Sequence, residues 1–177
     1  MSDPDPGAPL DAAPAARRAP RSVGRVHVLR MLAPPLGEPA SQVAEGYRLE
    51  RVRRDDGAVM SLVFTGDELV GEVTIHPRGH GDAFYGKYSM SDERYCYGSK
   101  LEVRPGFRGR NLGRQLVRVA RGMAFEEDGR GLASLVAPTN AASLRCHELE
   151  DFVPTLELQG IRLGDRTLWY RRRSVRP

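Results

Sequence analysis

The chain has 177 residues, of which 40% are hydrophobic and 28% are charged, and its formal net charge is +4. This length suits one domain with a single hydrophobic core, and the composition is typical of a globular protein. No apolar run approaches the roughly 20 residues that a membrane-spanning helix needs, so we expect no membrane insertion.

Most of the positive charge is arginine, because Lys87 and Lys100 are the only lysines. A basic surface can attract phosphates or nucleic acid, but the arginines are scattered and no aromatic-basic strand signature is present. The two cysteines, Cys96 and Cys146, form no ligand cluster with the four histidines. We therefore expect no nucleic-acid partner, no metal and a cytoplasmic location, while a homodimer stays open.

The two ends of the chain differ in composition from its middle. Residues 1–22 are rich in Pro, Ala and Asp and lack an apolar signal segment, which predicts a disordered tail. A single domain is then expected over residues 23–173, followed by a short tail at residues 174–177.

In chain order, the first half of this domain begins with an alternating strand at residues 26–29. A stretch with Pro and Gly has room for one short helix near residues 40–44, and residues 47–54 are ambiguous between helix and strand. The clearest element is a hairpin, with strands at residues 58–65 and 69–76 and a tight Gly-containing connection.

The second half alternates strands and helices. A Gly-rich, aromatic loop at residues 77–92 precedes a long strand at residues 94–104. Apolar residues at helical spacing predict a helix over residues 112–127. The remaining predicted elements are a buried strand at 132–137, a helix to about residue 149 capped by Thr139 or Asn140, and strands at 153–159 and 166–172.

This order of elements predicts an α/β (α+β) fold on a twisted mixed sheet of about six to seven strands, flanked by helices. The strand–helix–strand–helix centre implies parallel pairing between its two strands. The hairpins on either side imply antiparallel edges.

A basic turn with glycines joins the long strand to the helix at residues 112–127. A helix N-terminus has unpaired N–H donors and a partial positive charge, so a phosphate can bind there. Gly109 and Gly113 let a ligand approach the backbone closely, and the neighbouring arginines can pair with phosphate oxygens. The stretch is neither GxGxxG nor a P-loop, and taken alone a solvent-exposed basic turn is an equal alternative.

A second motif, PTNAASLRCHELEDF at residues 138–152, follows one strand later. The ordered pair resembles the two signature motifs of the GNAT superfamily of N-acetyltransferases, and the resemblance extends over roughly residues 69–172. The matching residues are Val103, Pro105, Arg108, Gly109 and Gly113 in the first motif, and Asn140, Ser143, Cys146 and Phe152 in the second. The chain departs at Asn111 and Asp151, where the family has Gly, and at His147, where it often has Tyr.

The resemblance implies a V-shaped splay between the two central parallel strands, with acetyl-CoA or another acyl-CoA bound in the gap. The backbone after Lys100 would pair with the pantetheine arm, the turn before the helix would hold the pyrophosphate, and Asn140 would bond the pantetheine or thioester. The residues that this assigns to cofactor binding are Leu101, Glu102, Val103, Arg108, Gly109, Arg110, Asn111, Leu112, Gly113, Arg114, Asn140 and Ser143.

The implied reaction is direct attack of a primary amine, on a small molecule or a peptide, on the thioester. His147 would donate a proton to the leaving thiolate, its alternative being a half-exposed helix histidine. Glu102 or Glu72 would act as base or amine anchor, and the alternative for each is a solvent-facing strand residue. Cys146 is expected to face the core.

The loop before the long strand could close over the acceptor, although an ordinary solvated loop is about equally expected. Its candidate substrate residues are His80, Asp82, Tyr85 and Glu93. Because the motif departures touch the catalytic positions, a non-catalytic CoA-binding or regulatory module is the alternative function.

Overall fold

The computed structural model describes residues 21–31, 43–77, 95–127, 131–163 and 166–171. Its strands are β1 (Arg21–Met31), β2 (Arg48–Arg53), β3 (Val59–Thr65), β4 (Glu68–His76), β5 (Cys96–Val103), β6 (Leu132–Val136), β7 (Phe152–Leu163) and β8 (Arg166–Arg171). Its helical elements are the short 3-10 turn η1 (Pro105–Phe107) and the α-helices α2 (Leu112–Glu127) and α3 (Ala141–Glu148).

The strands form one mixed sheet in the order β2-β3-β4-β5-β6-β1-β7-β8. Among the described strands, β5 and β6 form the one parallel pair, and the other neighbours run antiparallel. The mixed sheet and its central parallel pair are therefore confirmed. The described residues contain eight strands, one more than the upper number predicted, because the ambiguous residues 47–54 contain β2.

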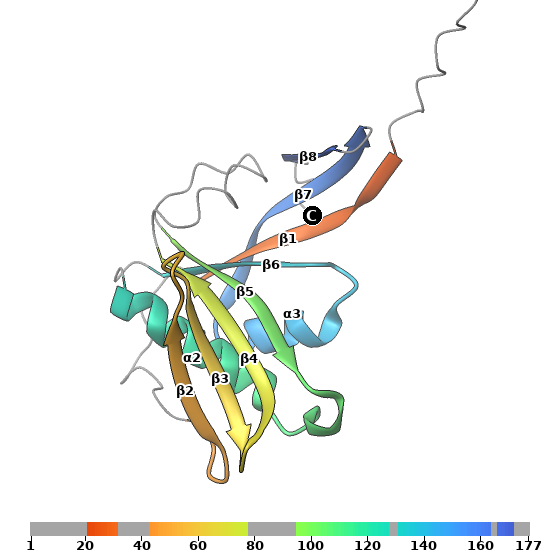
Figure 1. Ribbon diagram of the computed structural model, residues 1–177. Coiled ribbons are helices and arrows are strands. Elements are labelled where there is room, and N and C mark those ends of the chain that lie inside the picture. The colour runs from red at the N-terminus through yellow and green to blue at the C-terminus, as the bar shows by residue number, and fades with distance from the viewer. Residues whose placement is uncertain (1–20, 32–42, 78–94, 128–130, 164–165, 172–177) are drawn as a thin grey trace, which may run out of the picture.

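The first strand lies inside the sheet rather than at an edge. Residues 27–30 of β1 pair with β6, while β1 pairs along its length with β7. Strands β1, β7 and β8 form a ribbon that extends away from the body of the sheet (Figure 1). The local alternation at residues 26–29 predicted a strand there but not its position.

Helix α2 covers one face of the sheet because an apolar stripe follows its 3.6-residue period. Leu112, Leu116 and Met123 are buried in the stripe and join the core with Val63 and Ile75 of the neighbouring strands. Burying each such large side chain contributes about 1.5–3 kcal/mol. Helix α3 packs against α2 and β7.

The predicted helix over residues 112–127 is confirmed as α2, and the hairpin is confirmed as β3 and β4. Of the expected short helix, residues 40–42 lie outside the described residues, and Val43 and Ala44 are not helical. Strand β1 begins at Arg21, two residues before the expected domain start. Among the described helices, none has the length and apolar character needed to cross a bilayer.

Candidate functional site

The site begins where β5 and β6 part. The two strands pair only from Cys96 to Gly98, opposite Leu132 to Ser134, although both continue beyond. A Cβ at Gly98 would lie 3.0 Å from the Ser134 hydroxyl oxygen, so glycine permits the close approach at the last pair. Past this point the strands diverge and form the expected splay (Figure 1).

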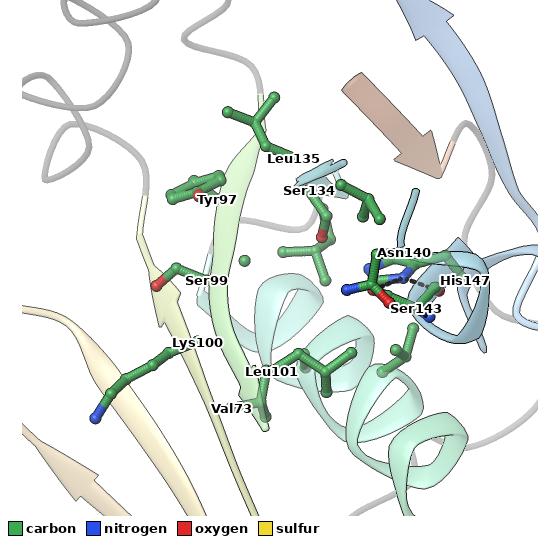
Figure 2. Close-up of a pocket in the computed structure, with 15 residues that line it drawn as sticks. Val73, Tyr97, Ser99, Lys100, Leu101, Ser134, Leu135, Asn140, Ser143 and His147 are labelled. Atoms are coloured by element: carbon green, nitrogen blue, oxygen red, sulfur yellow. Dashed lines mark hydrogen bonds between the residues drawn. The ribbon is translucent and has the colours of Figure 1, made fainter. Parts of the chain in front are cut away.

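A β-bulge shapes the strand that borders the gap. Glu102 pairs with Glu72 and Ser99 with Thr74, so two β5 residues oppose one residue of β4. Lys100, inside the bulge, has a φ of 55°. Such a bulge takes backbone groups out of the ladder and redirects side chains. The Lys100 ammonium lies 2.9 Å from the Glu72 carboxylate and points away from the gap (Figure 2).

An outer cavity of about 670 Å³ lies between the end of β5, the start of α2, and α3. Asn111 and Gly109, which border it, have φ angles of 64° and 77°, so Asn111 takes a left-handed conformation, which glycine adopts most readily. Asp151, the other residue in a family glycine position, also has a φ of 64°. Both departures therefore keep the backbone that a glycine would provide.

The basic side chains at this cavity are held by the protein. Arg108 donates from Nε to the Val103 carbonyl oxygen at 3.0 Å, and the Arg110 guanidinium lies 5.0 Å from the centre of the Phe107 ring. Arg114 donates from Nε to the Glu150 carboxylate at 2.7 Å. The backbone N–H groups at the start of α2 are therefore the donors that the helix geometry leaves for an anion.

A buried carboxylate fixes the arginine face of α2. The Glu150 side chain is 4% exposed and also contacts Arg118 at 2.9 Å and Arg121 at 3.6 Å. Burial alone would raise the Glu150 pKa, but hydrogen bonds from Arg118 and Arg114 outweigh it and lower that pKa. We did not predict this cluster, although the spacing of the three arginines places them on one helix face.

An inner cavity of about 240 Å³ lies under the splay, with Val117 and Ala120 of α2 among its lining residues. Leu101, Asn140 and Ser143 border both cavities, so these three residues mark the junction between them. Figure 2 shows Leu101 on one side of the gap and Asn140 and Ser143 on the other.

Asn140 begins α3 and faces this junction. Its side-chain oxygen accepts a hydrogen bond from the Ser143 backbone N–H at 3.1 Å, which confirms an N-cap at one of the two predicted positions. Because the oxygen caps the helix, the amide NH₂ is the group that Asn140 can offer to a ligand.

His147 is 4% exposed, so the alternative of a half-exposed helix histidine is wrong. Its Nδ1 lies 2.8 Å from the Ser143 carbonyl oxygen, which assigns the proton of the neutral ring to Nδ1. Phe152 meets the ring edge-on at 5.0 Å, and burial lowers the His147 pKa. In this tautomer Nε2 accepts a proton, so donation to a thiolate would first require a protonated ring.

Cys146 is half-buried, packs against the core and also borders the outer cavity. The expectation that Cys146 faces the core therefore describes only part of its surroundings. Its sulfur lies 3.2 Å from where a Cβ on Gly113 would stand, so Gly113 permits α2 and α3 to approach closely. Burial raises the pKa of the Cys146 thiol, which disfavours a nucleophilic thiolate.

A polar group on β4 and β5 was missed by sequence reasoning. His76 Nε2 lies 3.0 Å from the Ser99 hydroxyl, and its ring stacks on Tyr97 with 5.6 Å between ring centres. Burial lowers the His76 pKa, so the ring is neutral near pH 7. Tyr97 and Ser99 border the inner cavity, and strand alternation from Tyr97 was the one signal that placed them together.

The remaining candidates are placed as follows. Glu102 is exposed and borders the outer cavity, whereas Glu72 borders neither cavity and pairs with Lys100. The candidate acceptor residues His80, Asp82, Tyr85 and Glu93 lie outside the described residues. Within the described ranges no cluster of His, Cys, Asp or Glu could hold a metal ion.

Comparison with known proteins gives the family. The sequence profile of the acetyltransferase (GNAT) family matches residues 25–151, well over half of the chain. The chain belongs to the GNAT acetyltransferase family. Members of this family are generally acetyltransferases, which typically use acetyl-CoA.

Solved structures share the GNAT fold. A Drosophila melanogaster protein superposes with a TM-score of 0.59 at 12% identity, covering 82% of this chain and 52% of that one. A GNAT-family protein from Novosphingobium aromaticivorans gives a TM-score of 0.54 at 16% identity, covering 89% of this chain and 69% of that one. The chain thus spans about half the length of the Drosophila protein. Comparison with curated proteins finds no match.

Proposed function

We propose that this GNAT protein is an acyl-CoA-dependent N-acyltransferase that acylates a primary amine. The observation that carries the proposal is the pair of joined cavities. The outer one opens on the start of α2, the inner one lies under the splay, and both share Leu101, Asn140 and Ser143.

The chain's own groups fit an acyl-CoA along this path. The β5 backbone from Leu101 to Val103 borders the outer cavity and can pair with the amides of a pantetheine arm as an added strand does. The N–H groups from Gly109 to Gly113 surround the position for a pyrophosphate, and the left-handed turn at Asn111 directs the backbone there. Asn140 offers its NH₂ at the junction.

Neutral groups near the inner cavity would accept and transfer the proton of the amine. An acyl-CoA supplies a thioester carbonyl carbon that a neutral amine can attack. Because most primary amines are protonated at neutral pH, a base is needed near the gap. His147 Nε2 is one such base, and Ser99, bonded to neutral His76, can relay a proton on the other side of the gap.

Calorimetric titration with CoA tests the proposed pyrophosphate site at residues 109–113. Gly109→Ala places a Cβ on a backbone with φ of 77° at the cavity, and we expect CoA affinity to fall about tenfold or more. Gly66→Ala is the matched control, because Gly66 also has positive φ and open space around it but lies in the β3–β4 turn. Equal CoA binding by both variants and the wild type would reject the pyrophosphate site at residues 109–113.

The second candidate function is a non-catalytic CoA-binding module. It is favoured by the buried, Nδ1-protonated His147 in the position where the family often has a tyrosine donor. Thiol release from acetyl-CoA with a panel of amines separates the two. CoA binding without turnover on any amine favours the module, and amine-dependent release favours the enzyme.

A further inference from the structure

A polar cluster lies on the face of the sheet opposite α2. Successive β4 residues alternate between the two faces, and Ile75 is buried in the core with α2. Its neighbours Thr74 and His76 therefore point to the other face. Their ladder partners on β5, Ser99 and Tyr97, share that face, because directly opposed residues lie on the same side of a sheet.

Two contacts and one unused hydroxyl characterise this cluster. His76 Nε2 lies 3.0 Å from the Ser99 hydroxyl oxygen, and Tyr97 stacks on the His76 ring. Thr74 is 2% exposed, and its hydroxyl has no hydrogen-bond partner within the described part of the chain. Buried hydroxyls in proteins are normally paired, so the cluster has hydrogen-bonding capacity left for a ligand or an ordered water.

The inner cavity connects this face with the proposed acyl-CoA site. Its lining includes Val117 and Ala120 of α2 on one face and Tyr97 and Ser99 on the other, because β5 and β6 pair only at their first residues. Leu101, at the junction with the outer cavity, follows Ser99 by two residues, which is about 6–7 Å in a regular strand. An amine beside Ser99 would thus lie close to a thioester at the junction.

We propose that the acceptor amine approaches the thioester from the face opposite α2 and passes its proton through the Ser99 hydroxyl to His76. Ser99 is then a catalytic residue, because it contacts the amine, and His76 is a positioning residue that acts through Ser99. The assignment rests on the proposed acyl-CoA site, and it places the base on β4 and β5 rather than on α3.

The position of His147 supports this division. His147 lies with Asn140 and Ser143 on the other side of β5 from Ser99 (Figure 2). A thioester that Asn140 binds from the α3 side leaves the Ser99 side open to a nucleophile. His147 is also only 4% exposed, so an incoming amine reaches it less readily than it reaches the half-buried His76.

The proposed step balances without another reactant. The neutral amine forms a C–N bond to the thioester carbonyl carbon, and its nitrogen becomes positively charged. That nitrogen passes a proton to Ser99 Oγ while the Ser99 hydroxyl proton moves to His76 Nε2, which is free to accept it when the ring proton is on Nδ1. The C–S bond then breaks, and its electron pair leaves on the CoA sulfur. His76 returns its proton to that thiolate or to water.

The groups around His76 keep its ring neutral. Burial is the largest effect and lowers the His76 pKa from its ordinary value of 6.5. In the turn between β2 and β3, the Asp56 charge raises that pKa and the Arg54 charge lowers it, while Tyr97 covers the ring. The ring can therefore accept a proton throughout the range above about pH 6.5.

Thiol release from acetyl-CoA tests the relay, with the primary amine that gives the fastest release as acceptor. His76→Gln keeps an amide that can bond Ser99 but cannot take up a proton, and Ser99→Ala removes the hydroxyl. Both should lower kcat/KM about 100-fold near neutral pH, whereas Ser99→Thr, which keeps a hydroxyl, should retain most of the activity.

The pH dependence separates proton transfer from a structural role. The ratio of wild-type to His76→Gln kcat/KM should be constant above about pH 6.5 and decrease as the pH falls through the lowered His76 pKa. Protonation of the free amine affects both proteins equally and cancels in this ratio. CoA affinity, measured by calorimetry, should be unchanged in His76→Gln, because His76 borders neither cavity.

Matched controls come from the same sheet. Ser61→Ala removes a hydroxyl of β3 in a residue that is 0% exposed, and His27→Gln replaces a half-buried histidine of β1. Neither residue borders the inner or the outer cavity. Both variants should therefore turn over as the wild type does.

The outcomes separate this inference from the proposed function. Absence of amine-dependent release by the wild type would reject the enzyme and the relay with it. Wild-type turnover that His76→Gln and Ser99→Ala leave unchanged would overturn the relay and leave the enzyme standing. A rate ratio that stays constant at acidic pH, or a loss of CoA affinity as large as the loss of rate, would show that His76 is only structural. An acetyl ester on Ser99 in peptide mass spectra would make Ser99 a nucleophile and overturn its role in proton transfer.

Discussion

Replacing Glu150 with Gln should destabilise the protein strongly, although the side chain keeps its size. Glu150 is the shared partner of three arginines on α2, with contacts at 2.7 Å to Arg114, 2.9 Å to Arg118 and 3.6 Å to Arg121. The substitution removes the negative charge that all three arginines share. The Arg121 side chain is only 9% exposed, and the other carboxylate that it contacts, Asp151 at 3.7 Å, is 86% exposed, so Arg121 would lose its buried counter-charge.

The magnitude follows from the exposure of each partner. Removing one partner of a buried ion pair typically costs about 3–5 kcal/mol of stability. Arg114 and Arg118 are 34% and 47% exposed, so water can replace part of what they lose. We therefore expect Glu150→Gln to lower the free energy of unfolding by about 2–3 kcal/mol. In a chain of this length, that corresponds to a decrease in Tm of roughly 4–12 °C.

Glu148→Gln provides the matched control for this measurement. Glu148 lies two residues away and contacts Arg145 at 2.7 Å, but its side chain is 67% exposed and that of Arg145 is 63% exposed. Such a surface pair contributes about 0–1 kcal/mol, so this variant should unfold close to the wild type.

Urea denaturation and thermal melts of the two variants decide the question. The Glu150 contribution should be complete above about pH 4.5 and decrease as the pH falls through the lowered pKa of the folded state. If Glu150→Gln costs no more than Glu148→Gln at neutral pH, then the buried cluster does not stabilise the contact between α2 and the end of α3.

Three further predictions concern the site. Asn140→Ala should remove the cap on the Ser143 N–H and lower stability by about 0.5–2 kcal/mol in denaturant unfolding, with the exposed neighbour Thr139→Ala as control. Asn111→Ala should destabilise by about 1–2 kcal/mol because of its left-handed backbone, whereas Asn111→Gly should not, and equal stability of the two would refute that backbone. Because the folded pKa of His147 is lowered, the unfolded state takes up a proton more readily than the folded state, and the protein loses stability as the pH falls below about 6.5. His147→Phe should therefore lose less stability than the wild type between about pH 7 and pH 5, and unchanged pH dependence would contradict this.

Local sequence patterns predicted the elements that have one buried face and one exposed face. Helix α2 follows from its apolar spacing because one face is buried against β4 and β5. Strand β2 stayed ambiguous because it lies at the edge of the sheet, and Val52 is 45% exposed where alternation would require a buried residue. The cap at Asn140 was predictable because capping is a local interaction.

The parts of the site that depend on long-range contacts were not predictable in this way. Glu150 meets Arg114 across 36 residues, and His76 meets Ser99 across 23 residues. No periodicity within one segment specifies such a pair. The family motif predicted which positions surround the gap, but the volume of the inner cavity depends on how α2 packs beneath two separate strands.

The interior position of β1 has a consequence for how the chain folds. Met31 pairs with Phe152 and Arg21 with Arg162, so this strand finds its β7 partner only after almost the whole chain is available. Proteins dominated by such distant pairings fold slowly, in about milliseconds to seconds. The chain must lose the entropy of closing a long loop before the contacts between the two strands can stabilise it. During synthesis, the meander of β2 to β5 can form while both edges of β1 are still unpaired, because β6 and β7 come later in the chain. Chaperone dependence and aggregation on refolding should therefore concentrate on this first strand.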